Sequence, residues 1–105
     1  MSNSLLQRTQ VVEDEVELSL ADLCRACEAD REVIVELVSY GLLDAEGTDP
    51  TDWRFAGSSL RRGRVALRLI RSLEVNVAGA AVAVELIEQI EALRGALAVS
   101  GSRRR

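Results

Sequence analysis

The two cysteines of the chain, Cys24 and Cys27, stand three residues apart, a spacing used by both zinc sites and thiol redox centres. A structural zinc ion takes four ligands, and the sequence has no histidine and no second cysteine pair. Four thiolates could therefore meet only across a dimer. A redox pair of the thioredoxin kind needs a β-α-β setting, which the sequence pattern does not offer. We expect both thiols to pack on one side of a helix, and we predict no metal and no cofactor.

The other side chains favour no catalytic mechanism. Histidine, the commonest general base, is absent, and all 13 basic residues are arginine. Without lysine the chain cannot form a Schiff base or build a phosphate loop of the lysine type. No serine or cysteine stands beside a plausible base. The sequence therefore predicts a protein that is not an enzyme.

Charge is distributed unequally along the chain. Residues 1–55 hold 4 arginines and 13 acids, a net charge of −9, whereas residues 56–105 hold 9 arginines and 4 acids, a net charge of +5. Four of these arginines follow each other at spacings of 3, 4 and 3, so they share one face of a helix: Arg61, Arg64, Arg68 and Arg71. With Arg54 they are the candidate nucleic-acid contacts. The simpler interpretation is that they pair with the acids of the first half, within one chain or between subunits.

A second candidate surface is acidic. On a helix over residues 31–40 the predicted outer face carries Glu32, Val35, Glu36 and Ser39, and the opposite apolar face, which includes Tyr40, is predicted to be buried. Two carboxylates would repel phosphates, so this helix is a poor DNA reader. Two interpretations remain open from the residues alone: an ordinary solvated face, or a docking surface for a basic partner.

Length and composition place these residues in one globular domain. The chain has 105 residues, of which 48% are hydrophobic and only 3% aromatic, so we expect an aliphatic, mainly helical core. The longest nearly apolar stretch, residues 75–84, is too short to cross a membrane. With no visible secretory signal and only two cysteines, we expect a reduced cytoplasmic protein.

The element pattern predicts a winged helix-turn-helix. We expect a mobile N-terminus over 1–10, the winged domain over 11–75, a C-terminal helix over 76–99 and a disordered tail over 100–105. Within the domain we expect an edge strand in 11–18, a helix capped by Ser19, a second helix from Asp30 to Gly41, a two-stranded wing over 42–55, and a third helix over 57–73 capped by Ser58 or Ser59. The apolar stripe of this third helix, which we expect to face the core, comprises Leu60, Ala66, Leu67, Ile70 and Leu73.

The C-terminal helix, with Asn76 as its expected cap, carries an apolar seam. Four residues repeat at spacings of 4, 3 and 4, which is the seam of a coiled coil: Leu86, Ile90, Leu93 and Leu97. Such a seam packs on its own domain or pairs with a second subunit. Because a chain this short offers few packing partners for the helix, we favour a symmetric homodimer.

The order of these features resembles the MerR-like winged-helix fold and, within it, the chaperone-modulator family CbpM. The likeness covers residues 16–97 and rests on Leu23-Cys24, the run from Glu36-Leu37-Val38 to Gly41-Leu42-Leu43, Trp53 with Phe55, Arg68-Leu69, Leu73, Val77-Ala78-Gly79-Ala80 and the aliphatic helix over 83–93. The resemblance implies a cytoplasmic regulator that binds the J-domain of a DnaJ-like co-chaperone, CbpA, and restrains its stimulation of Hsp70. It also implies a basic helix on that J-domain, which favours docking at the acidic face. The alternative is a MerR-like transcription regulator using Arg31, Arg54 and the four arginines of the third helix.

Overall fold

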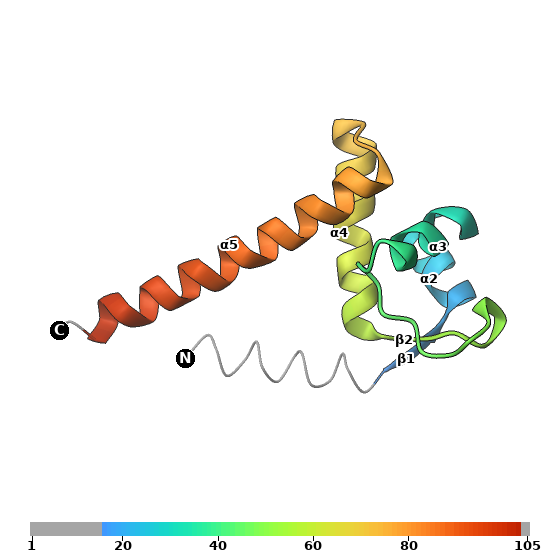
Figure 1. The fold of residues 1–105 in the computed structure, drawn as a ribbon, viewed down its shortest axis with the longest axis horizontal. Helices are drawn as coiled ribbons and strands as arrows, with labels where there is room; N and C mark the ends of the chain where they lie inside the picture. The colour runs from blue at the N-terminus through green and yellow to red at the C-terminus, as the bar shows by residue number, and fades with distance from the viewer. Residues whose placement is uncertain (1–15, 104–105) are drawn as a thin grey trace.

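The computed structural model describes residues 16–103, and this part of the chain is mainly helical, as predicted (Figure 1). A short two-stranded sheet accompanies four α-helices and one 3₁₀ turn. In chain order these elements are β1 (Glu17–Ser19), α2 (Leu20–Cys27), α3 (Arg31–Ser39), η1 (Pro50–Asp52), β2 (Arg54–Ala56), α4 (Gly57–Leu73) and α5 (Val77–Arg103). Residues 1–15, and with them the expected N-terminus and most of the expected edge strand, lie outside the described part.

Local capping signals define the helix-turn-helix of α2 and α3. Ser19 and Asp22 form the predicted capping box, in which the Ser19 amide donates to Asp22 Oδ2 at 2.9 Å and the Asp22 amide donates to Ser19 Oγ at 3.1 Å. Asp30 precedes α3 as expected, but it caps through its backbone carbonyl, because its side chain makes no capping bond. Gly41 follows α3 with a φ of +78°, the left-handed conformation that glycine adopts most easily.

The wing differs from the predicted hairpin over residues 42–55. β2 pairs with β1 in antiparallel register, Leu18 opposite Phe55, and the loop before β2 contributes one isolated bridge, Glu46 to Arg54. Leu42 and Leu43 are buried core residues rather than strand residues. The amide of Leu42 donates to the Leu37 carbonyl at 3.0 Å, so it completes the end of α3 and is not free to pair in a sheet.

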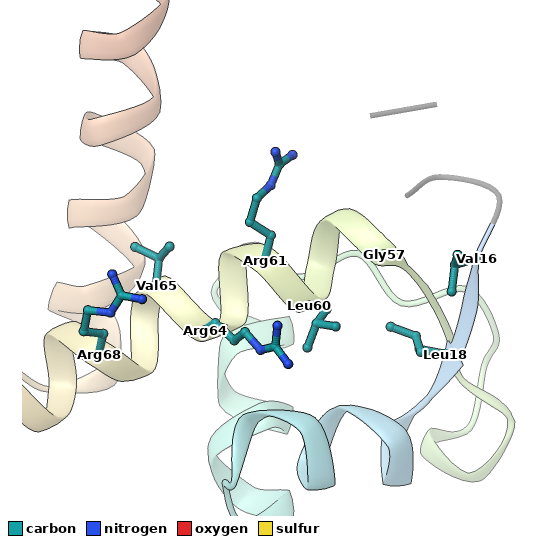
Figure 2. A pocket seen from close by; sticks show the side chains of 8 residues that line it. All are labelled: Val16, Leu18, Gly57, Leu60, Arg61, Arg64, Val65 and Arg68. Carbon is teal, nitrogen blue, oxygen red and sulfur yellow. The ribbon is translucent and has the colours of Figure 1, made fainter. Parts of the chain in front are cut away.

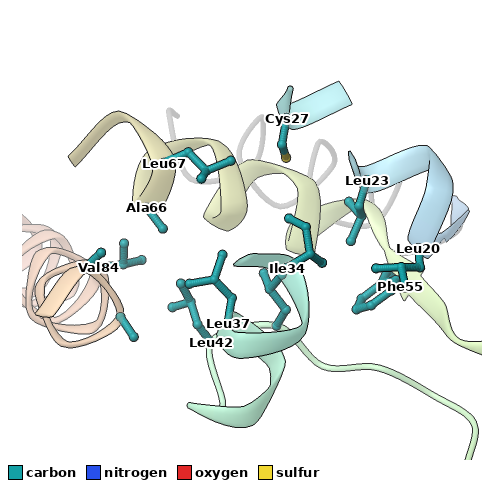
Figure 3. Packing of buried hydrophobic residues seen from close by; sticks show 13 residues of the cluster. Leu20, Leu23, Cys27, Ile34, Leu37, Leu42, Phe55, Ala66, Leu67 and Val84 are labelled. Carbon is teal, nitrogen blue, oxygen red and sulfur yellow. The ribbon is translucent and has the colours of Figure 1, made fainter. Parts of the chain in front are cut away.

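The core lies where α2, α3 and α4 meet, and it continues into the first turns of α5 (Figure 3). It is aliphatic apart from Phe55, whose ring meets the half-buried Trp53 ring edge-on with centroids 5.9 Å apart. The buried residues are Leu20, Leu23, Cys27, Ile34, Leu37, Leu42, Leu43, Phe55, Ala66, Leu67, Ala80, Ala81 and Val84. This core fixes which faces of α3, α4 and α5 remain for partners.

Helix α4 begins earlier than its expected caps. It starts at Gly57 after Ala56, no side chain caps it, and Ser59 is buried, so the prediction of Ser58 or Ser59 as the cap is wrong. Ala66 and Leu67 are buried as predicted, but Leu73, expected in the same core stripe, is 64% exposed because α4 ends there beyond the reach of α2.

Helix α5 begins as predicted and ends later. The Gly79 amide donates to Asn76 Oδ1 at 2.7 Å, which confirms the expected cap. The helix continues to Arg103, past the expected end at residue 99 and into the segment that we expected to be disordered. Its first turns pack on α4, and the rest projects away from the other elements (Figure 1). None of the helices in residues 16–103 is long and apolar enough to span a membrane.

Candidate interaction surfaces

Helix α3 presents the acidic face to solvent. Ile34 and Leu37 hold the opposite side of the helix in the core, and as a result Glu32, Glu36 and Ser39 are exposed. Within residues 16–103 neither carboxylate forms an ion pair, whereas the Ser39 hydroxyl donates to the Glu36 carbonyl at 2.7 Å. The face therefore offers two charges that a cationic partner could neutralise.

The apolar part of this face is arranged differently from the prediction. Val35, expected between the two glutamates as an exposed contact, is half-buried against the core. Tyr40, expected on the buried side, is 51% exposed. Tyr40 follows the last residue of α3, and its amide still donates to the Glu36 carbonyl at 3.0 Å, so its ring lies at the end of the helix. An exposed tyrosine at the end of an acidic helix suits a protein interface.

The four arginines of α4 are exposed on one side of that helix, as their spacing predicts. Arg71 donates to the carbonyls of Cys27 and Glu28, so it closes the C-terminal end of α2 instead of pairing with an acid. Arg64 and Arg68 form no ion pair with any residue in the described part of the chain. Within residues 16–103, the expected pairing with the acids of the first half is therefore not found for these three arginines.

Arg54 lies apart from the arginines of α4. It lines a hollow with Glu17, Asp44 and Glu46, and its guanidinium donates to the Trp53 carbonyl at 2.9 Å. Three carboxylates beside one guanidinium make this part of the wing a poor phosphate site. The structure thus separates Arg54 from the other candidate nucleic-acid contacts.

Arg62 is a structural residue that the sequence analysis did not identify. Its Nη1 donates to the Leu42 carbonyl at 2.6 Å and its Nη2 to Glu88 at 3.1 Å, while its buried Nε has no hydrogen-bond partner among the described residues. The side chain links the end of the helix-turn-helix to α5. Its position off the arginine face, four residues before the apolar Ala66, was the available signal.

The cysteines pack against neighbouring helices. Cys24 is half-buried and Cys27 is buried, and desolvation raises the pKa of both thiols, which disfavours the reactive thiolate. Cys27 lies beside Gly63 of α4, where an added Cβ would be 3.5 Å from its sulfur. In residues 16–103 no group of three or more cysteine, aspartate or glutamate side chains is placed to hold a metal ion.

The predicted seam of α5 is open to solvent in the single chain. The exposed fractions are 51% for Leu86, 49% for Ile90, 65% for Leu93 and 71% for Leu97. Residues 92–101 are all exposed, so no other part of the described chain covers this stretch. Contiguous apolar surface of this kind marks an interaction site on a folded protein.

Comparison with known proteins agrees with this architecture. Residues 18–99 match the MerR HTH family of regulatory proteins. Chaperone modulatory protein CbpM of Coxiella burnetii is 36% identical over 83 residues, covering 79% of this chain and 78% of the relative. Its namesake in Pseudomonas putida is 30% identical over 79 residues, covering 75% of this chain and 78% of the relative. By its helix-turn-helix, its small sheet and these matches, the chain belongs to the MerR-like CbpM family of chaperone modulatory proteins.

Proposed function

We propose that this protein binds the J-domain of a DnaJ-like, CbpA-type co-chaperone and thereby restrains its stimulation of Hsp70. One observation supports this above all. The helix that would read DNA in a MerR-like regulator instead exposes Glu32 and Glu36, and neither is paired within residues 16–103. A basic helix on the J-domain is the complement of such a face.

The parts of the acidic face of α3 have different roles in the proposed interaction. The two carboxylates steer a basic partner during encounter and form charged hydrogen bonds after docking. Tyr40 adds an exposed ring at the C-terminal end of the same helix. Binding in this way needs no cofactor and no catalytic group, and we expect it to occur in the cytoplasm.

We further propose that the protein acts as a homodimer joined through the seam of α5. An isolated helix shorter than about 12–15 residues is marginal in water, so a partner that covers the exposed distal part of α5 would stabilise it. A second copy supplies the same apolar seam in matching register.

The test is a calorimetric titration with the J-domain of the host's DnaJ-like protein at physiological salt. We expect micromolar or tighter binding with one J-domain per chain. The double variant Glu32→Arg/Glu36→Arg should bind at least about tenfold more weakly, because it replaces attraction by repulsion. Its matched control is Asp44→Arg/Glu46→Arg, which changes the net charge equally at exposed positions outside α3.

Equal loss in both variants would show that only net charge matters and would remove α3 as the docking face. Full-strength binding by the α3 variant would do the same. Failure of the parent protein to bind, repeated at a second temperature, would overturn J-domain binding itself. Whether binding lowers co-chaperone activity is then measured as the J-domain-stimulated ATPase rate of Hsp70, which should fall as this protein is added.

The DNA-binding alternative has less support. Arg31 is the one exposed cation of α3, and it stands next to Glu32, while Arg54 lies among three carboxylates. A gel shift that weakens steeply with salt would nevertheless favour it over the J-domain.

A further inference from the structure

The structure contains a second candidate surface that shares no residue with the acidic face of α3. It is a hollow of about 500 Å³ between β1 and α4, lined by Val16, Leu18, Gly57, Leu60, Arg61, Arg64, Val65 and Arg68 (Figure 2). We call it the α4 groove. We propose that the α4 groove binds an acidic peptide segment of a partner protein, one that carries apolar anchor residues between its carboxylates.

The floor of the α4 groove is apolar. Val16 directly precedes β1, and Leu18 lies within it. Because the two residues are two positions apart, their side chains project to the same side of the strand. Leu60 faces them from the first turns of α4, as Figure 2 shows. Val16 is 44% exposed, which leaves apolar surface that a peptide side chain would cover.

The rim of the α4 groove is cationic. Three arginines of α4 line it. Two of them, Arg64 and Arg68, lie four residues apart, a rise of about 6 Å along the helix at 1.5 Å per residue. Arg64 and Arg68 form no ion pair within residues 16–103. The same two arginines also line the neighbouring hollow beside Arg71, so the cationic row continues past the groove.

The combination of floor and rim selects the class of ligand. Two guanidiniums about 6 Å apart along the helix suit a ligand with two or more anionic groups at peptide-like intervals better than a single fatty-acid carboxylate. Nucleic-acid backbone supplies repeated charge but no apolar side chain for the floor. An acidic peptide with leucine or valine anchors matches both, and arginine binds carboxylates in a bidentate manner.

The first test uses a fluorescently labelled eight-residue peptide of alternating leucine and glutamate, titrated with the full chain and followed by anisotropy. We expect saturable binding that Arg64→Gln/Arg68→Gln weakens at least tenfold. Both positions are exposed, so this variant should keep its fold, which circular dichroism checks. The matched control, Arg31→Gln/Arg94→Gln, removes the same charge at exposed positions outside the groove and should bind within twofold of the parent.

The floor is tested separately by Val16→Ser, which should weaken binding at least threefold without unfolding the protein. Equal binding of a peptide with glutamine in place of glutamate would overturn the cationic rim. No binding at millimolar peptide, or a twelve-nucleotide single strand that binds more tightly than the peptide, would overturn the proposal. J-domain binding is tested with variants of Glu32 and Glu36, which lie outside the α4 groove. A negative result at one surface therefore leaves the conclusion about the other surface unchanged.

Discussion

Gly63 shows how closely α4 packs against α2. It is buried in α4 against Cys27, and a Cβ there would lie 3.5 Å from the Cys27 sulfur and 3.9 Å from Leu43 Cδ2. Both distances are ordinary van der Waals contacts, so the site accepts a methyl group. The glycine consequently costs helix stability without being required for the approach of the two helices.

We predict that Gly63→Ala raises the free energy of unfolding by about 0.5–1 kcal/mol, the usual gain of alanine over glycine inside a helix. Urea unfolding followed by fluorescence of Trp53, the single tryptophan, measures it. Gly41→Ala is the control. That site has open space but a φ of +78°, so alanine there should lower stability by about 1 kcal/mol through backbone strain. A loss of stability at both glycines would show that α4 has no room for the methyl group.

Cys27 gives a second prediction at this scale, concerning pH. Burial raises the pKa of its thiol above the ordinary value of 9.0. A raised pKa means that the folded state holds the proton more tightly than the unfolded state does. Its contribution to stability is therefore complete below pH 9.0 and is lost as the pH rises through the folded-state value.

Cys27→Ala should accordingly lose less stability than the parent between neutral and strongly alkaline pH, as measured by urea unfolding at each pH. Equal alkaline losses in the two proteins would show that Cys27 does not carry the effect. Cys24→Ala separates the contribution of the second, half-buried thiol.

At the scale of elements, Arg62 sets how α5 leaves the domain. It binds the Leu42 carbonyl at the end of the helix-turn-helix and Glu88 on α5, so one guanidinium ties three elements together. The half-exposed ion pair to Glu88 contributes little by itself. The bond to the buried end of α3 is worth more, because its loss leaves a carbonyl without a partner.

Arg62→Met keeps the apolar stem and removes both bonds, and we predict that it lowers the free energy of unfolding by about 2 kcal/mol. Glu88→Gln removes the ion pair and should cost less than about 1 kcal/mol. Urea unfolding of both variants decides the matter. Similar losses would mean that the surface ion pair, and not the Leu42 bond, carries the stabilisation.

The elements also show which features a sequence encodes locally. The Ser19–Asp22 box, the Asn76 cap and the left-handed Gly41 were all predictable, because each depends on residues within four positions. The pairing of β1 with β2 joins segments more than thirty residues apart, and no local pattern announces it. The predicted entering strand at Leu42 and Leu43 was wrong because these residues complete the end of α3, whereas the returning strand is present as β2 and bridges to Glu46.

The candidate docking face was predictable to the same degree. Helical periodicity correctly placed Glu32, Glu36 and Ser39 outside. It misplaced Val35 and Tyr40, because the first depends on how closely the core approaches and the second lies past the last helical turn. Arg62 was missed since its partners come from two other elements.

For the whole molecule, the exposed apolar seam of α5 makes the oligomeric state the main property to test. We predict that the parent sediments as a dimer at micromolar concentration, and that Ile90→Glu sediments as a monomer, because the glutamates would be buried near each other in the seam. Sedimentation velocity measures both. Gln89→Glu, one position away from the seam, adds the same charge and should leave the dimer intact. A monomeric parent, or a dimer in the Ile90 variant, would place association elsewhere.

The long exposed stretch of α5 also affects the dynamics of the protein. Residues 92–101 pack against no other part of the described chain, so we expect them in a single molecule to wind and unwind as an isolated helix does, within about a microsecond. Amide hydrogens in this stretch then exchange with solvent almost as freely as in a peptide, while those of the core wait for global unfolding. The amide hydrogen exchange rate near the C-terminus of α5 thus reports the fraction of time that a molecule spends as a monomer.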